Sequence, residues 1–350
     1  MGKTSKTLFI FATLVVIAAG IKAAEDLVVP FLLAAFIATI AANPVFWLEK
    51  HKVPAGIAIA LVMMGIVAMA IGIGAVVAQS VGSFTAKLPF YQARLVEIVE
   101  SLIAFVEPLG VEISKELLLS YFDPGTALVM AGNTLRGLGS VLSNSFLILL
   151  TVIFILAEAS SFPRKLRDVS SDPDQVLPHF ARFAENVNRY MGIKTTISIV
   201  TGVIVAVFLA LLGVDFPVLW GLLAFLLNYV PTIGSFIAAI PAVLLALIQL
   251  GPLQAAIVAG GYVVVNIIMG NAVEPRFMGR GLGLSTLVVF LSLVFWGWML
   301  GPVGMLLSVP LTITAKIALE ASPSSAWIAS LLGPADKQGA AETAAGETTP

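Results

Sequence analysis

The stretch "LLNYVPTIGSFIAAIPAVLLALI", Leu226 to Ile248, decides the fold class of this chain. It has the length and apolar content of a membrane span, because a helix of roughly 20 apolar residues crosses a bilayer. Asn228, Pro231 and Gly234, however, stand in its first half, where a simple anchor helix carries leucine or valine. In hydrocarbon each unpaired backbone group costs several kcal/mol, so irregular backbone at membrane depth lies inside protein or along a watery cavity. The stretch therefore predicts a broken helical hairpin in a membrane protein.

The composition around this stretch is that of a protein with several membrane spans. Of the 350 residues, 59% are hydrophobic and 11% are charged, whereas a typical soluble domain has about 25% charged residues. The apolar runs are continuous, which favours helices over the alternating strands of a β-barrel. The fold class is therefore all-α, a polytopic helical membrane protein of about eight membrane segments. The runs occupy residues 8–20, 27–42, 53–78, 146–157, 193–214, 217–250, 253–273 and 284–319.

The net charge and the cysteine count exclude several kinds of function. A net charge of -1 gives no case for nucleic-acid binding. Without any cysteine the chain forms no disulfide and has no thiol or iron-sulfur chemistry.

Two long polar stretches divide the chain into five regions. They are the N-terminal membrane helices (1–78), an amphipathic extracytoplasmic segment (79–145), a membrane helix with a cytoplasmic connection (146–192), a transport core (193–320), and a largely disordered C-terminal tail (321–350). In the second region, apolar residues recur at helical spacing with charges on the opposite face; these are Tyr91, Leu95, Ile98, Leu102, Phe105 and Leu109. They predict a helix that lies on the membrane surface or on protein.

Lysine and arginine in short loops predict the orientation of the chain in the membrane, because these residues are enriched in loops on the cytoplasmic side. We expect the first apolar run to be an uncleaved span, and Lys3 and Lys6 place the N-terminus before it in the cytoplasm. The acidic turn at Glu25 and Asp26 then lies outside, and the basic "EKHK" turn lies inside. Region 79–145 follows outside and the arginine-rich 158–192 inside, with the C-terminus cytoplasmic. This topology requires that 217–250 and 284–319 each enter and leave by one face, as full two-span pairs or as re-entrant hairpins.

The second hairpin repeats the pattern of the first. In "FLSLVFWGWMLGPVGMLLSVPLT", Phe290 to Thr312, two apolar arms flank a break at Gly301 and Gly304, and Pro310 interrupts the second arm. Paired interrupted segments are the best sequence indication of a transporter's binding site. The alternative is that both breaks only turn the chain between spans.

The candidate residues for a substrate or ion path follow from these breaks and from polar groups near them. The first hairpin contributes Asn228, Tyr229, Pro231, Thr232, Gly234 and Ser235, and the second contributes Gly301, Gly304 and Pro310. Asn266, Asn271, Glu274, Pro275 and Arg276 lie between the hairpins, and Arg189 lies before the fifth run.

Glu274 is the strongest candidate, because ionisable groups in membrane segments are usually functional. Asn266, eight positions earlier, is expected close to the same helical face. The carboxylate of Glu274 could bind sodium or carry a proton; alternatively it caps a helix or pairs with Arg276 at the cytoplasmic surface. Arg189 either anchors its helix at the interface or faces a vestibule.

Several other activities lack their sequence signals. The two histidines, His51 and His179, form no metal-binding motif, so no metal site is expected. No phosphate-binding loop for ATP is present either. We expect no enzyme activity and no cofactor.

Two quoted stretches carry a family resemblance. "LLGVDFPVLWGLLAFLLNYVPTIGSFIAAIPA" and "AVEPRFMGRGLGLSTLVVFLSLVFWGWMLGPVGMLLSVPLT" resemble the autoinducer-2 exporter family, with its "NYIPxiGs" turn, "ExPxxmG" loop and "GxxGmllavP" turn. These elements stand here at 228–235, 274–279 and 301–310. Thr232 replaces a common aromatic residue, and Ser308 replaces a common alanine.

The resemblance implies a transporter of the bacterial inner membrane, assembled as a homo-oligomer, a pentamer. Family members export the quorum-sensing signal autoinducer-2, and others exchange sodium or lithium for protons. The sequence thus predicts an ATP-independent transporter that exports a small polar solute such as autoinducer-2. The alternatives are a sodium(lithium)/proton antiporter that needs Glu274, and a non-transporting membrane scaffold in which 79–145 is a docking surface.

Overall fold

The computed structural model describes residues 3–107, 145–159, 162–169, 173–231, 233–278, 284–320 and 325–333. Over these ranges the chain is helical and no strand is found, as the sequence predicted. The helices are α1 (Lys3–Ala23), α2 (Glu25–Lys50), α3 (Ala55–Val106), α6 (Ser145–Ala159), α7 (Phe162–Val169), α8 (Pro173–Leu211), α9 (Pro217–Leu227), α10 (Ile233–Leu250), α11 (Pro252–Asn266), the π-helix η2 (Ile267–Val273), α12 (Glu274–Met278), α13 (Thr286–Glu320) and α14 (Ala326–Leu331). Thr232, residues 108–144 and the tail beyond 333 lie outside the described residues.

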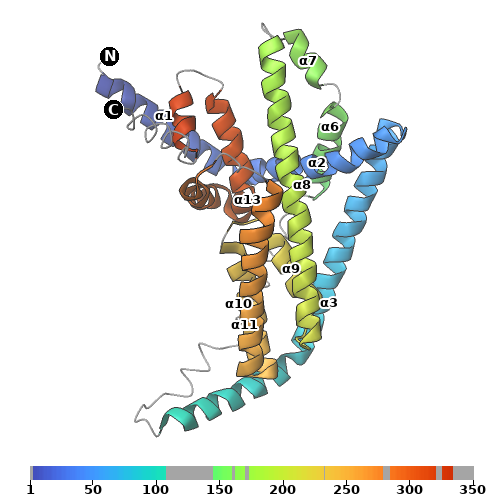
Figure 1. Ribbon diagram of the computed structural model, residues 1–350, viewed down its shortest axis with the longest axis vertical. Helices are drawn as coiled ribbons and strands as arrows, with labels where there is room; N and C mark the ends of the chain where they lie inside the picture. Colours follow the sequence, from blue (N-terminus) through green and yellow to red (C-terminus); the bar gives the residue numbers. More distant parts are fainter. Residues whose placement is uncertain are drawn as a thin grey trace, which may run out of the picture.

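Seven of the eight predicted apolar runs correspond to candidate spans or shorter apolar helices, and the first run, 8–20, lies in α1, which is not among them. Six described helices are long and apolar enough to cross a bilayer, and α6 and α9 are shorter apolar helices. The chain is thus a polytopic helical membrane protein. Figure 1 shows α8, α10 and α11 running side by side along the long axis of the molecule.

Two helices are much longer than a membrane is thick. The 52 residues of α3 and the 39 residues of α8 correspond to about 78 and 58 Å, against a hydrocarbon core of about 30 Å. The C-terminal part of α3 extends at the lower end of the molecule in Figure 1, and the N-terminal part of α8 at the upper end.

The N-terminal helices differ from the sequence prediction. Only Ala24 separates α1 from α2, its N–H donates to the carbonyl of Gly20, and its own carbonyl accepts from Val28. A single residue in near-helical conformation bends the chain but cannot reverse it, and Figure 1 shows α2 continuing onward from α1. The predicted chain reversal at Glu25 and Asp26 is wrong, because two acidic residues in the first turn of a helix suit its N-terminus as well as they suit a loop.

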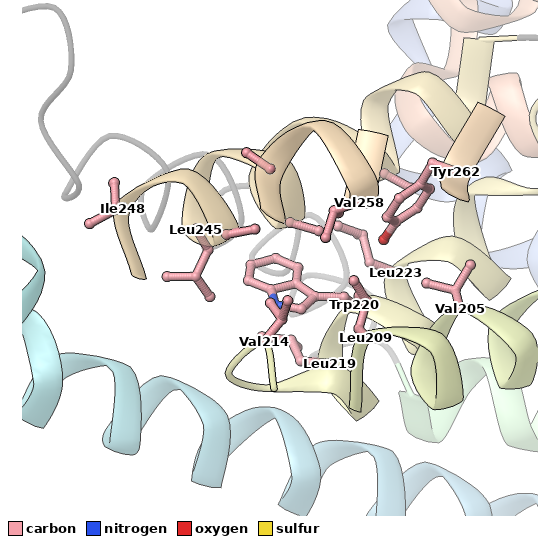
Figure 2. Packing of buried hydrophobic residues seen from close by; sticks show 14 of the residues in the cluster. Val205, Leu209, Val214, Leu219, Trp220, Leu223, Leu245, Ile248, Val258 and Tyr262 are labelled. Carbon is pink, nitrogen blue, oxygen red and sulfur yellow. The ribbon is translucent and has the colours of Figure 1, made fainter. Parts of the chain in front are cut away.

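The end of α3 confirms the amphipathic helix predicted after residue 79, up to residue 106, and shows that it lies on protein. Its buried stripe is Tyr91, Leu95 and Val99, spaced by four, whereas Ile98 is only partly buried. These side chains join the main core, which also contains the residues from α8 to α11 that Figure 2 shows packed around Trp220.

An ion pair and a hydrogen bond connect this part of α3 to the loop between α8 and α9. Lys87 Nζ lies 2.7 Å and Tyr91 Oη 2.6 Å from the same carboxylate oxygen of Asp215. The backbone N–H of Asp215 also donates to Gln249 of α10, at 2.9 Å. We call Lys87, Tyr91 and Asp215 the α3 latch.

The first hairpin, α9 and α10, has arms of unequal length. The 11 residues of α9 span about 16 Å, half of the hydrocarbon core, and the 18 residues of α10 span about 27 Å. Gly234 has ordinary helical geometry, but a Cβ there would lie 1.8 Å from the carbonyl oxygen of Leu227. This glycine therefore allows the two arms to approach each other.

The second hairpin lies within α13. Its break falls at Leu300 and Gly301, and Gly301 has a φ of +61°, which favours glycine. A Cβ at Gly304 would lie 2.0 Å from the carbonyl oxygen of Trp296. Both breaks predicted from Gly and Pro are therefore present.

Candidate functional site

A row of polar side chains on α8 marks the candidate site. Lys194, Thr195 and Ser198 occupy little more than one turn within the candidate span Val187–Leu211. Lys194 lies about 10 Å along the helix from Val187 and about 26 Å from Leu211. The row therefore lies within a candidate membrane span, near one end of it, and polar groups buried in such a span require partners.

Lys194 forms an ion pair with Glu274. Its ammonium nitrogen lies 2.8 and 2.9 Å from the two carboxylate oxygens; Lys194 is buried, with 3% of the residue exposed, and the Glu274 side chain is 23% exposed. Glu274 begins α12, immediately after the π-helical η2, and such segments are frequent at functional sites. The predicted pairing of Glu274 with Arg276 is thus replaced by a pairing with Lys194, because the carboxylate faces α8 while Arg276 is exposed.

The tip of the first hairpin bonds to the same turn of α8. Asn228 donates its amide N–H to Ser198 at 2.9 Å, and the hydroxyl of Tyr229 donates to Thr195 at 2.7 Å. The Tyr229 ring also packs edge-on against Phe36 of α2, with centroids 5.5 Å apart. We call Lys194, Glu274 and these two hydrogen-bonded pairs the polar cluster.

On the other side of the hairpin tip, a second polar contact faces α11. The amide of Asn266 donates a hydrogen bond to Ser235. Asn266 therefore bonds to α10 while Glu274 bonds to α8, and the structure does not bring these two predicted residues together. The π-helix between them changes the helical register that the sequence argument assumed.

The remaining candidates lie apart from the polar cluster. Pro231 is in the hairpin turn, Gly234 is buried at the start of α10, and Asn271, Arg276 and Arg189 are exposed. Pro275 is the second residue of α12. Gly301, Gly304 and Pro310 belong to α13. The predicted interruption at Pro310 is wrong, because the helix continues through this residue and its non-helical backbone is confined to Leu300 and Gly301. Val309 and Ile313 of the second arm pack in one apolar cluster with Tyr190 and Met191 of α8.

Sequence reasoning missed three residues of α8, Lys194, Thr195 and Ser198. The signal was present in "MGIKTTISIVTG", where one lysine interrupts an apolar run and Ser198 and Thr201 follow at intervals of four and three. This spacing places Lys194, Ser198 and Thr201 on one helical face, and an ionisable residue inside a span is a functional candidate by default.

The cluster offers a balanced set of groups to a polar molecule. The ammonium and the carboxylate together carry no net charge, and the amide, phenol and hydroxyl groups both donate and accept hydrogen bonds. Such a set can replace the water shell of a small polar solute at membrane depth.

Comparisons with known proteins give the family context. A family model described as "AI-2E family transporter" matches residues 11–324. The "AI-2 transport protein TqsA" of Escherichia coli is 42% identical over 333 residues, which is 95% of this chain and 97% of that protein. A "Putative transport protein" of Haemophilus influenzae is 42% identical over 334 residues, 94% of this chain and 96% of that protein. "Putative transport protein YhhT" of Escherichia coli is 39% identical over 323 residues, 92% and 93% of the two chains.

Proposed function

Because this chain belongs to the AI-2E family of transporters, we propose that it moves a small polar solute outward across the bacterial inner membrane without ATP. The proposed path passes the polar cluster between α8, the tip of the first hairpin and α12. The solute class follows from the relative TqsA, whose name assigns it AI-2 transport. Autoinducer-2 is therefore the cargo we propose to test first.

The observation that carries this proposal is the ion pair between the buried Lys194 and the partly buried Glu274. Removing two charges from water is costly, and a well-packed apolar pair of similar size is often equally stable or more stable. A purely structural role therefore explains the pair poorly. A role in which the pair opens to exchange partners with a passing solute explains both its charge and its position beside the broken hairpin.

We propose an orientation with both termini in the cytoplasm and the end of α3 outside. The structure supports this orientation through the distribution of charge along its long axis. The basic turn between α2 and α3 and the basic helix α7 lie toward the upper end in Figure 1, whereas the Asp215 loop and the end of α3 lie toward the lower end. The positive-inside rule assigns the upper end to the cytoplasm.

We also propose a homo-oligomer, a pentamer by family resemblance. The many large apolar side chains exposed on α3, α10 and α13 can be covered by lipid or by neighbouring copies. Native mass spectrometry of the detergent-extracted protein should show five chains, and a monomer would contradict this part of the proposal.

The experiment that tests the function is flux in liposomes made with the purified protein. Autoinducer-2, sodium and protons are followed in the same vesicles. We expect autoinducer-2 to equilibrate without ATP and without a sodium gradient. Sodium-dependent proton movement without autoinducer-2 flux would instead identify an antiporter, and vesicles inert to all three would favour a scaffold.

A further inference from the structure

A cavity of about 430 Å³ lies between α10 and α11. Its walls are mostly apolar, and Ala239 and Ala259, one from each helix, keep it open. Both walls belong to candidate membrane spans. Phe236, Ile240 and Val263 also line it and are exposed, so the cavity opens sideways at membrane depth.

The end of the cavity nearest the hairpin tip is polar. Ser235 and Asn266 line it and are bonded to each other. A side-chain amide has two N–H donors and one acceptor oxygen, so this bond engages one of its groups and leaves others to meet a ligand. Asn266 is 15 residues from Gly251 at the turn between the helices, about 22 Å along the axis.

We propose that this cavity binds one small amphipathic molecule that enters from the membrane. Its polar group would bond to Asn266 and Ser235, and its apolar body would lie along Ala239, Val243 and Ala259. The volume lies within the range of about 300 to 1,000 Å³ typical of small-molecule pockets, and it is too small for a two-chain lipid. This site is separate from the polar cluster and does not depend on the cargo proposed above.

Photolabelling with 4-hydroxybenzophenone, which has an apolar body and a single hydroxyl, tests the proposal on the full-length protein in liposomes. We expect saturable adducts concentrated in 235–244 and 259–266, located by mass spectrometry of fragments. Ala239→Phe and Ala259→Phe fill the cavity from opposite walls, and each should lower this labelling at least fivefold. Asn266→Val removes the hydrogen-bonding groups and should raise the probe concentration that gives half-saturation by about 3- to 10-fold.

Val264→Phe provides the matched control. The residue is exposed on α11 and does not line the cavity, so the substitution adds the same ring to the same helix outside the proposed site. Labelling of this variant should be unchanged. Every variant is first checked for the same elution volume in size-exclusion chromatography, and the second of the two cavity-filling variants serves if the first does not fold.

Three results would overturn the proposal. Labelling that does not saturate and spreads evenly over the exposed part of α3 would show only partition into lipid. Labelling of 235–244 that excess single-chain lipid abolishes but that Asn266→Val leaves unchanged would identify an acyl chain as the occupant. Labelling that appears only after the oligomer is dissociated in detergent would show that a second copy of the chain covers the cavity.

Discussion

In both broken hairpins a glycine at the start of the second arm lies against the last carbonyls of the first arm. A Cβ at Gly234 would lie 1.8 Å from the oxygen of Leu227, and a Cβ at Gly304 would lie 2.0 Å from the oxygen of Trp296. Both hairpins therefore use a glycine to let their two arms approach closely. This common requirement accounts for the similar sequence patterns of two segments whose residues do not align.

The polar side chains of the two hairpins behave differently. At the first tip, Asn228 and Tyr229 bond across to α8. In the second hairpin, Ser292 and Ser308 donate to carbonyls of their own helix, and the bond between Trp296 and Thr312 joins the two arms of α13 to each other. Glycine and proline thus predict where a chain breaks, whereas the partners of the neighbouring polar groups indicate which break belongs to a site.

The largest effect is expected from substitutions that block the close approach of the two arms in each hairpin. Gly234→Leu and Gly304→Leu should each reduce the folded, monodisperse protein more than tenfold, because a side chain there meets backbone that cannot move aside. Yield after size-exclusion chromatography measures this effect. Gly260→Leu on α11, where a Cβ meets nothing within 4 Å, is the control. A folded Gly234→Leu protein would show that the arms of the first hairpin can separate.

The next effect concerns the ion pair beside the first hairpin. Glu274→Gln alone should lower the free energy of unfolding by about 3 to 5 kcal/mol, because it leaves the buried ammonium of Lys194 without its charge partner. Lys194→Met should cost less, because the Glu274 carboxylate that it leaves unpaired is partly exposed. The double variant should recover most of that stability and still lack flux. Thermal unfolding and liposome flux separate the two properties.

Lys316 and Glu320 on α13 provide the control for this pair. They form a more exposed ion pair at 3.6 Å, for which a contribution of about 0 to 1 kcal/mol is typical. Lys316→Met should leave flux unchanged. If the double variant at Lys194 and Glu274 transported normally, the pair would be structural.

A matched pair of substitutions compares the hairpins directly. Asn228→Leu should reduce flux about tenfold, because it removes the bond between the first tip and Ser198. Thr312→Val removes the bond to Trp296 and should cost about 1 kcal/mol in stability with little effect on flux. Equal flux losses in the two variants would mean that both hairpins line the path.

The smallest effect is expected at the α3 latch. Asp215→Asn keeps an acceptor for Tyr91 and loses the charge that faces Lys87, whose side chain is half exposed. Pairs of this kind contribute about 0 to 1 kcal/mol, so the melting temperature should fall by only a few degrees. Lys87→Met should produce the same shift, and a much larger fall for either variant would show that the latch holds the whole first hairpin in place.

The sequence allowed the fold class to be predicted more fully than the site. Continuous apolar runs determine membrane helices, and paired Gly and Pro determine breaks, because both depend on local chemistry. The partner of Glu274 depends on how α12 packs on α8, 80 residues away in the chain, and no local pattern specifies it. Asn266 was placed on the wrong face because a π-helix follows it.

The closed ion pair of Lys194 and Glu274 also bears on how the membrane potential acts on the protein. A single charge that moves through the whole field gains about 2.3 kcal/mol per 100 mV, whereas a closed pair that moves as a unit carries no net charge through it. While the pair is closed, the field therefore does no net work on it. If the two charges move different distances through the field as the pair opens, the rate of transport of an uncharged solute should depend on the imposed voltage, and a rate that is the same at every voltage would show that they do not separate along the field.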